Sequence, residues 1–254
     1  LWNIVVGSLK KVHFSINGMV RRFENKLLSA IGHSKYDIVL VINGQRITSH
    51  FTHEIRINNL KPNGKMVLYY WDAIENLKDD TSRWNDFDRI LTFDNVDYEE
   101  HKDRMCFLPL FYCDKYWNDK KSLLKYDVMI IGYFRLNRYN FIKELEANNP
   151  GIRVGYYLYH SKWGFIFHKT FRSKYSHVKY EDLKYKQLSF EDVVDLYGQS
   201  SAIIDVPQKG QRGLTIRSLE ALAMHKKLIT TNENIKLYDF YNPDDVYVLL
   251  GANA

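Results

Sequence analysis

Residues 208–232 hold the side chains whose types and spacing best fit ligand chemistry. The segment reads QKGQRGLTIRSLEALAMHKKLITTN. Its pattern predicts a glycine-containing loop, a helix over 215–224 and a strand over 227–231. Backbone N–H groups at the start of such a helix bind phosphate, and Arg212 and Arg217 can add charge-assisted hydrogen bonds to a diphosphate. The segment therefore predicts an anion site where the helix begins.

Two further residues of the predicted helix are candidates for ligand contact. Thr215 stands near its start, and Glu220 follows about a turn and a half later. A carboxylate at that distance can accept two hydrogen bonds from the hydroxyls of a ribose. An ordinary solvated glutamate on an amphipathic helix explains Glu220 equally well.

The elements around these residues predict an α/β fold with parallel sheets. The helix expected at 15–32 is followed by apolar runs at 37–43, 67–71 and 89–93, and the run at 37–43 is typical of a strand buried on both faces. The second half of the chain again alternates predicted strands and helices, with strands at 127–132, 154–158 and 202–206 and a helix at 189–197. We expect two Rossmann-like domains, 1–125 and 126–254, of which the first is incomplete because it opens near a helix.

Two polar residues follow strands of the first domain. Asp72 comes after VLYYW and Asp94 after RILTF. In an open parallel sheet both would face the ligand-binding edge, because ligands bind beyond the carboxyl ends of the strands. A helix N-cap or a turn is the competing explanation for each aspartate.

The composition of the chain disfavours several classes of function. The chain has 254 residues, and its 36 basic and 30 acidic residues give a net charge of +6 that is dispersed along the sequence, which disfavours a nucleic-acid-binding module. Cys106 and Cys113 lack the spacing of a zinc site or a disulfide framework. No apolar run reaches the roughly 18 residues of a spanning helix. We expect a cytoplasmic protein whose membrane contact, where it occurs, is peripheral.

Residues 208–232 resemble the donor-binding region of GT-B glycosyltransferases, which reads roughly E-x-x-G-x-x-x-x-E-A-(M/L)-A-x-G-x-P. Arg212 stands where that motif has its first Glu, and residues 225–227 (HKK) replace the Gly-x-Pro turn. The version G-L-T-x-R-S-L-E-x-L-x-x-x-K-K-L-I-T-T-N is similar to bacterial glycosyltransferases of lipopolysaccharide O-antigen and capsule biosynthesis. YYWDAIEN, FDRILTFDNVDYE and LPLFY in the first half also resemble them, so the likeness spans 36–247.

The resemblance implies a fold of two Rossmann-like domains that face a cleft. It also implies a nucleotide-sugar donor, with a UDP-sugar slightly favoured. It implies a lipid-linked or oligosaccharide acceptor, contact with the cytoplasmic face of the inner membrane, no cofactor and no metal. The implied donor-binding residues are Gly132, Tyr133, Arg138, Arg212, Gly213, Leu214, Thr215, Arg217 and Glu220. The D-x-D pattern at 86–88, which holds a metal in another glycosyltransferase fold, is better explained as a loop and cap leading into a strand.

The catalytic residues implied are Asp72 and Asp94, of which one would deprotonate the acceptor hydroxyl in an inverting reaction. Asp72 is preferred, because further polar groups surround it in WDAIEN. Arg212 in place of the first Glu leaves the stereochemistry open. Another transferase or an epimerase on the same scaffold, such as a pyruvyltransferase or a nucleotide-sugar epimerase, is the alternative, because a fold does not fix a function.

Overall fold

The computed structural model describes residues 13–44, 47–77, 81–116, 123–208 and 210–249. The chain divides into two compact units. Unit 1 comprises Leu1–Pro109 and Gly210–Gly213, and unit 2 comprises Leu110–Lys209 and Leu214–Ala254. The division falls earlier than the boundary expected after residue 125. The reason is Tyr116, which is buried in the core of unit 2 with its ring 4.6 Å from that of Phe190.

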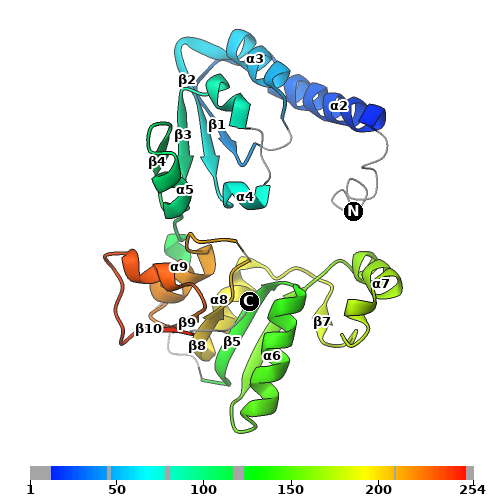
Figure 1. The fold of residues 1–254 in the computed structure, drawn as a ribbon, viewed down its shortest axis with the longest axis vertical. Coiled ribbons are helices and arrows are strands. Elements are labelled where there is room, and N and C mark those ends of the chain that lie inside the picture. Colours follow the sequence, from blue (N-terminus) through cyan, green and yellow to red (C-terminus); the bar gives the residue numbers. More distant parts are fainter. Residues whose placement is uncertain (1–12, 45–46, 78–80, 117–122, 209, 250–254) are drawn as a thin grey trace. The chain divides into compact units, whose positions relative to one another are not determined.

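Unit 1 is an α/β unit around a parallel sheet of order β1-β2-β3-β4 (Figure 1). Its elements are α2 (His13–Ile31), β1 (Tyr36–Ile42), α3 (Ser49–Asn58), β2 (Leu60–Tyr70), α4 (Ile74–Leu77), η1 (Thr81–Asp86), β3 (Arg89–Thr92), α5 (Asn95–Glu100) and β4 (Met105–Phe107). Parallel pairing brings the carboxyl ends of these strands to one edge of the sheet. The residues that follow the strands therefore lie along that edge.

The strand β1 departs from the expected burial. Val39 and Val41 pack into the core with Leu27 and Leu28 of α2, whereas the alternate side chains are exposed, Ile38 by 65% and Leu40 by 54%. Side chains of a strand alternate between the two faces of a sheet, and only one face of β1 is covered among the described residues. The expectation of burial on both faces is wrong for this strand.

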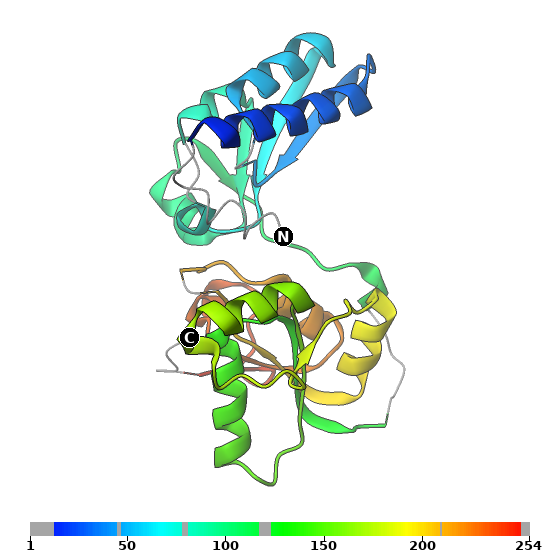
Figure 2. The same ribbon diagram turned by 90° about the vertical axis from the view of Figure 1, so that its right-hand side faces the viewer.

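Unit 2 is a larger parallel sheet of order β10-β9-β8-β5-β6-β7. Its elements are η2 (Asp114–Tyr116), β5 (Tyr126–Tyr133), α6 (Leu136–Asn148), β6 (Val154–Tyr159), α7 (Lys162–Phe171), η3 (Ser173–Tyr175), β7 (Leu183–Lys184), α8 (Phe190–Gly198), β8 (Ser200–Asp205), α9 (Ile216–Ala223), β9 (Lys227–Thr230), η4 (Glu233–Leu237) and β10 (Val246–Val248). Figure 2 shows the same units from a second direction.

The strand order of unit 2 reverses between β5 and β8. From β5 the chain adds β6 and β7 on one side, and from β8 it adds β9 and β10 on the other. Both faces of β5 are buried, because Met129 and Ile131 belong to one core cluster and Val128 and Ile130 to the other. Such a switch point, at the carboxyl ends of buried strands, is where open α/β sheets bind ligands.

Candidate functional site

A pocket of about 510 Å³ lies where strands of the unit 2 sheet end. It is lined by Phe134, Arg135, Leu136, Asn137, His160, His168, Lys174, Tyr175 and Gln208. The residues at 134–137 follow β5, His160 follows β6 and Gln208 lies in the loop after β8. We call it the cationic pocket, because its charged lining residues are Arg135 and Lys174 and two histidines add further basic groups.

The start of α6 adds the dipole of a helix N-terminus to this pocket. Arg135 is the N-cap residue, and its side chain makes no capping hydrogen bond to the helix. Its guanidinium instead donates to Oε1 of Gln208 over 2.6 Å. Leu136 and Asn137, in the first turn, line the pocket. The first N–H groups of a helix have no partner within the helix, so this arrangement suits an anion.

His168 responds to the positive charge of the pocket. Its pKa is lowered by burial and further by Arg172, His160 and Lys174, so the imidazole is neutral at pH 7. Its Nδ1 atom is buried and has no hydrogen-bond partner among the described residues. A buried polar nitrogen without a partner is uncommon in folded proteins. A ligand group that bonds to it would remove that deficit.

A buried carboxylate organises the start of α9 behind this edge of the sheet. Asp205 ends β8, is fully buried, and accepts hydrogen bonds from Thr215 Oγ1 at 2.5 Å and Ser218 Oγ at 2.7 Å. It also accepts from Nε of Arg217 at 3.1 Å. Thr215 is at the same time the N-cap of α9, accepting from the Ser218 N–H. Asp205 therefore fixes both the helix start and the direction of the Arg217 side chain.

Gly132, near the end of β5, lies against two of the predicted donor-binding arginines. A Cβ at this position would be 3.0 Å from Nη1 of Arg138 and 3.3 Å from Nη1 of Arg217. Arg138 is buried and donates to the carbonyl oxygens of Tyr133, at 2.6 Å, and Val206, at 2.7 Å. Its contacts are those of a residue that holds the β5 and β8 ends together. The Tyr133 side chain is 62% exposed beside them.

Burial and neighbouring charge act differently on these two arginines. Burial, and then the proximity of Arg217, lower the pKa of Arg138 to about 9. Burial also disfavours the charged form of Arg217, but Asp205 and other neighbours outweigh it and the pKa of Arg217 is raised. Both side chains remain positively charged at pH 7. Asp205 compensates the charge of Arg217, whereas Arg138 donates to uncharged carbonyl oxygens.

Glu220 lies in the interior of unit 2, within the same polar network. Only 8% of it is exposed, and the hydroxyl of Tyr116 bonds to its carboxylate. Burial raises the pKa of Glu220, while the Tyr116 bond and Arg217 oppose that rise. Contact with a ribose at Glu220 stays a prediction, and it would require an exchange of the Tyr116 bond.

The corresponding edge of the unit 1 sheet presents Asp72. Asn43, which follows β1 with a left-handed φ of 62°, donates from Nδ2 to Oδ2 of Asp72 over 3.1 Å. Its Oδ1 accepts from the Trp71 N–H at 2.7 Å. Asn tolerates this backbone conformation better than most residues do. The side chain of Asp72 is thereby oriented while the residue stays half-buried.

Asp94, the other predicted catalytic residue, is fully buried. One carboxylate oxygen caps α5 by accepting from the N–H groups of Val96 and Asp97. The other accepts from the N–H groups of Arg212, at 3.0 Å, and Gly213, at 2.7 Å. With both oxygens doubly occupied, Asp94 acts as a helix cap and an anchor for residues 210–213, which is poor geometry for a general base.

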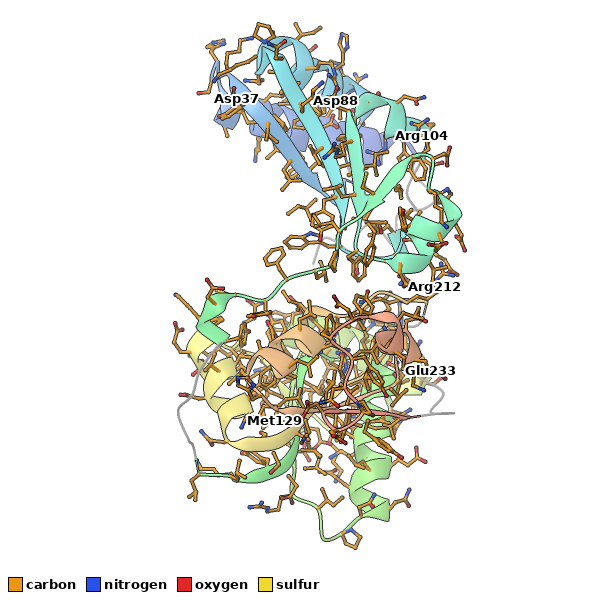
Figure 3. The ribbon with its side chains drawn as sticks, turned by 90° about the vertical axis from the view of Figure 1, so that its left-hand side faces the viewer. Asp37, Asp88, Arg104, Met129, Arg212 and Glu233 are labelled. Carbon is orange, nitrogen blue, oxygen red and sulfur yellow. The ribbon has the colours of Figure 1, made fainter. Side chains whose placement is uncertain are left out.

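Three residues predicted to contact the donor have other surroundings. Figure 3 labels Arg212, whose guanidinium lies 3.5 Å from a carboxylate oxygen of Asp97 and 3.6 Å from one of Glu100. A Cβ on Gly213 would be 2.7 Å from the ring of Phe93, so glycine is required there by packing. Leu214 is only 2% exposed and belongs to the core of unit 2.

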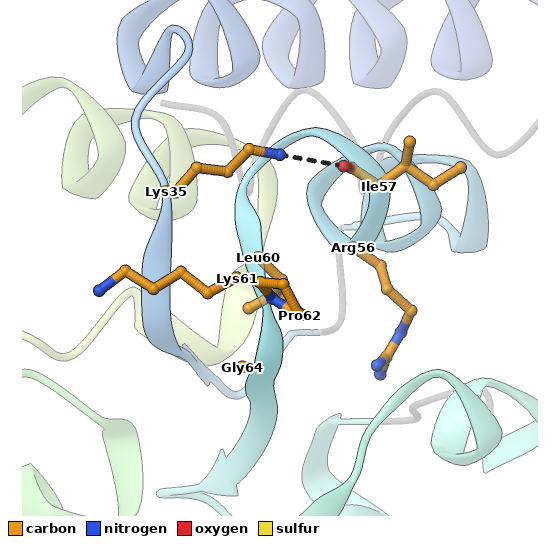
Figure 4. Close-up of a pocket in the computed structure, with 7 residues that line it drawn as sticks. All are labelled: Lys35, Arg56, Ile57, Leu60, Lys61, Pro62 and Gly64. Atoms are coloured by element: carbon orange, nitrogen blue, oxygen red, sulfur yellow. Dashed lines mark hydrogen bonds between the residues drawn. The ribbon is translucent and has the colours of Figure 1, made fainter.

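A second pocket, of about 460 Å³, lies where β1 and β2 begin and is lined by Lys35, Arg56, Ile57, Leu60, Lys61, Pro62 and Gly64 (Figure 4). Its cations have protein partners. Lys35 donates to the Ile57 carbonyl, Lys61 pairs with Asp37 at 2.8 Å, and Arg56 pairs with Asp88 at 3.1 Å. It lies at the edge opposite to the strand ends, so we place the candidate site elsewhere.

In the described part of the chain, no group of three or more His, Cys, Asp or Glu side chains could hold a metal ion. Asp86 of the D-x-D pattern accepts from the Thr52 hydroxyl, and Asp88 accepts from the Met66 N–H. Within the same residues, no helix combines the length and the apolar character that crossing a membrane requires.

No protein-family model matches the chain, and no curated protein matches it. Solved structures do resemble it. Sucrose-phosphate synthase from Thermosynechococcus elongatus aligns over 96% of this chain and 68% of its own, with 11% identity and a TM-score of 0.56. Anabaena HepE, in complex with UDP and glucose, aligns over 92% and 67%, with 9% identity and a TM-score of 0.57.

The catalytic domain of starch synthase IV from Arabidopsis thaliana, bound to ADP and acarbose, aligns over 88% of this chain and 62% of its own, with 11% identity and a TM-score of 0.51. This chain thus spans about two thirds of the length of each of the three. The likeness confirms the predicted α/β fold with parallel sheets, which the chain shares with these three structures.

Proposed function

We propose that this protein is a glycosyltransferase that takes its sugar from a nucleotide-sugar donor. The observation that carries the proposal is the cationic pocket, where Arg135, Lys174 and the uncapped start of α6 meet at the strand ends of unit 2. These groups suit a diphosphate. Two solved structures of the same fold contain nucleotides, UDP in one and ADP in the other, which supports this choice.

Unit 2 would stabilise the leaving group. As the bond between the sugar and the diphosphate breaks, negative charge develops on the departing nucleotide diphosphate. Arg135 and Lys174 neutralise it from the pocket, and Arg217, whose direction Asp205 fixes, places hydrogen-bond donors beside Gly132 at the end of β5. This arrangement needs no divalent cation, so we propose a metal-independent reaction.

Unit 1 would supply the proton acceptor. Asp72 is our candidate for the base that takes the proton from the acceptor hydroxyl while the new glycosidic bond forms. The hydrogen bond from Asn43 orients its carboxylate. Asp94 supports the reaction as a positioning residue, because its carboxylate anchors residues 210–213 immediately before α9.

The finer assignment rests on the sequence resemblance. The likeness of residues 208–232 to O-antigen and capsule glycosyltransferases supports a growing cell-surface glycan as the product. We propose a UDP-sugar as donor and a lipid-linked or oligosaccharide acceptor. The protein would act in the cytoplasm, with peripheral contact to the inner face of the membrane.

Calorimetry with UDP, ADP, GDP, dTDP and CMP in EDTA tests the proposal. We expect one of these nucleotides to bind. Replacing Arg135 and Lys174 together by Ala should weaken its binding by about 30-fold or more, because two charge-assisted hydrogen bonds are lost. Lys236→Ala, at an exposed lysine of η4, is the matched charge control.

An unchanged affinity in the double variant would rule out the cationic pocket as the diphosphate site. With nucleotide sugars, release of the nucleotide and a new glycosidic product support glycosyl transfer. Interconversion of the sugar, or consumption of phosphoenolpyruvate, would instead support the epimerase or the pyruvyltransferase alternative.

A further inference from the structure

The helix α7 carries an exposed row of large aromatic side chains. Trp163 is 74% exposed, Phe167 37% and Phe171 72%. They follow one another at intervals of four residues, so they lie along one side of the helix. The rings of Phe167 and Phe171 are 4.9 Å apart. We call Trp163, Phe167 and Phe171 the aromatic face.

The other side of α7 packs into the core of unit 2 and holds the helix in place. Phe165 is fully buried, and its ring lies 5.7 Å from that of Phe134 and 5.2 Å from that of Tyr180. Gly164 is also buried, with no room for a Cβ beside Ser161. The aromatic face is therefore additional to the packing that holds α7 on unit 2.

The place of α7 leaves the aromatic face accessible. The helix connects β6 to β7, at the end of the unit 2 sheet opposite to β10. Figure 1 shows it at the periphery of that unit, and in the view of Figure 2 it lies in the foreground of the unit. Three bulky rings exposed together on one helix are uncommon on a surface that meets only water.

The charge around α7 indicates what the aromatic face meets. Residues 160–180 contain no Asp or Glu, and their basic residues are Lys162, Lys169, Arg172, Lys174 and Lys179. Lys162 and Arg172, at the two ends of the helix, are both exposed. Aromatic side chains flanked by Lys and Arg are typical of helices that lie in the headgroup region of an anionic bilayer.

We propose that the aromatic face of α7 is a docking surface for an anionic lipid membrane. Trp163, Phe167 and Phe171 enter the boundary between headgroups and acyl chains, and Lys162 and Arg172 contact the anionic headgroups. This surface would provide the peripheral membrane contact of the proposed function. The inference rests on the membrane contact of the proposed function and is independent of sugar transfer.

Flotation with lipid vesicles tests the surface. We expect the protein to bind phosphatidylcholine vesicles with about 30% phosphatidylglycerol, and to bind pure phosphatidylcholine much more weakly. Replacing Trp163 and Phe171 by Ser should lower the partition coefficient at least about tenfold. The matched control makes the same Ser replacements at Leu237 and Tyr247, which are exposed by 70% and 66%. It should change the partition coefficient less than about twofold.

Trp163→Phe provides a second readout that does not depend on a disruptive change. This variant should keep its vesicle binding but lose quenching of tryptophan fluorescence by brominated lipids. Persistent quenching, or equal vesicle binding by the Ser variant, would overturn the proposal. Self-association without lipid that the Ser variant abolishes would also overturn it, by assigning the face to a second copy of the chain.

The nucleotide calorimetry separates this inference from the proposed glycosyltransferase activity. Vesicle binding with no nucleotide binding would contradict the activity alone. Nucleotide binding without vesicle binding would contradict the membrane surface alone.

Discussion

The two sheets differ in charge at the edges where their strands end. At the edge of unit 1 the strand-end residues are Asp72 and Asp94, with Asp97 in the helix that follows. At the edge of unit 2 the basic residues of the cationic pocket dominate, because Asp205 at the end of β8 is paired with Arg217. The same α/β topology thus carries carboxylates at the strand ends of one unit and a cluster of basic side chains at those of the other. A reaction that needs both a base and a place for a diphosphate matches that difference.

The strand-end aspartates also differ among themselves. Asp94 and Asp205 are fully buried, and each is surrounded by hydrogen-bond donors of the chain. Asp72 is half-buried and has its bond from Asn43. A buried, saturated carboxylate stabilises a fold, whereas a partly accessible one can exchange a proton. The comparison predicts that removing the three charges will have three separable effects.

The largest effect is expected for Asp72→Asn. Loss of a general base should lower kcat by about 10²–10⁴-fold, while the affinity for the nucleotide stays the same. Initial rates of nucleotide release and calorimetry measure the two quantities on the same sample. A variant with full activity would remove Asp72 from the mechanism.

Asp205→Ala should instead act on stability. Its removal leaves the hydroxyls of Thr215 and Ser218 without their acceptor and Arg217 without its ion pair. Breaking a buried charged network from one side costs about 3–5 kcal/mol of the free energy of unfolding of unit 2. Urea denaturation followed by far-UV circular dichroism measures it. A loss below 1 kcal/mol would show that the network is not important for the fold.

Asp94→Ala should destabilise unit 1 by about 2–4 kcal/mol, because it removes the cap of α5 and the acceptor for two further N–H groups. Asp94→Asn is the milder control, since its amide oxygen can still accept hydrogen bonds. Hydrogen exchange should show faster exchange at Arg212 and Gly213 in the Ala variant. Unchanged exchange at both N–H groups would contradict the anchoring role.

The smallest effect is the pH response of His168. Its pKa is lowered in the folded protein, so its contribution to stability is complete above the unfolded value of about 6.5 and is lost as the pH falls below it. A bound diphosphate favours the protonated form, so nucleotide binding should tighten between pH 7.5 and pH 6. Calorimetry across that range measures the change. His168→Gln should flatten the profile, and an identical profile would contradict the assignment.

Much of the fold could be predicted from the sequence, because its signals are local. The helix α2, the strands β5 and β8 and the helix α9 follow apolar patterns that a window of residues reveals. The exposed face of β1 could not be predicted. Whether an apolar strand is covered on both faces depends on which elements lie beside it, and the run itself does not encode this.

The candidate site was predictable only in part. Thr215 and Arg217 lie on one helix, so their spacing indicated a shared role. The cationic pocket joins residues after β5 and β6 with Lys174 of η3, and no local spacing connects them. Asp205 could have been predicted from the sequence, because it ends a strand and Asp72 and Asp94 were predicted from similar positions after strands.

The bonds from Arg212 and Gly213 to Asp94 join residues 118 and 119 positions apart. A ribosome releases residues in order, so Asp94 emerges long before its two donors do. Until then, one carboxylate oxygen of Asp94 can cap α5, but the other has only water to bond to, and the folding of unit 1 stays incomplete during that interval. Unit 1 therefore reaches its final state after most of unit 2 has been synthesised, although it is encoded first.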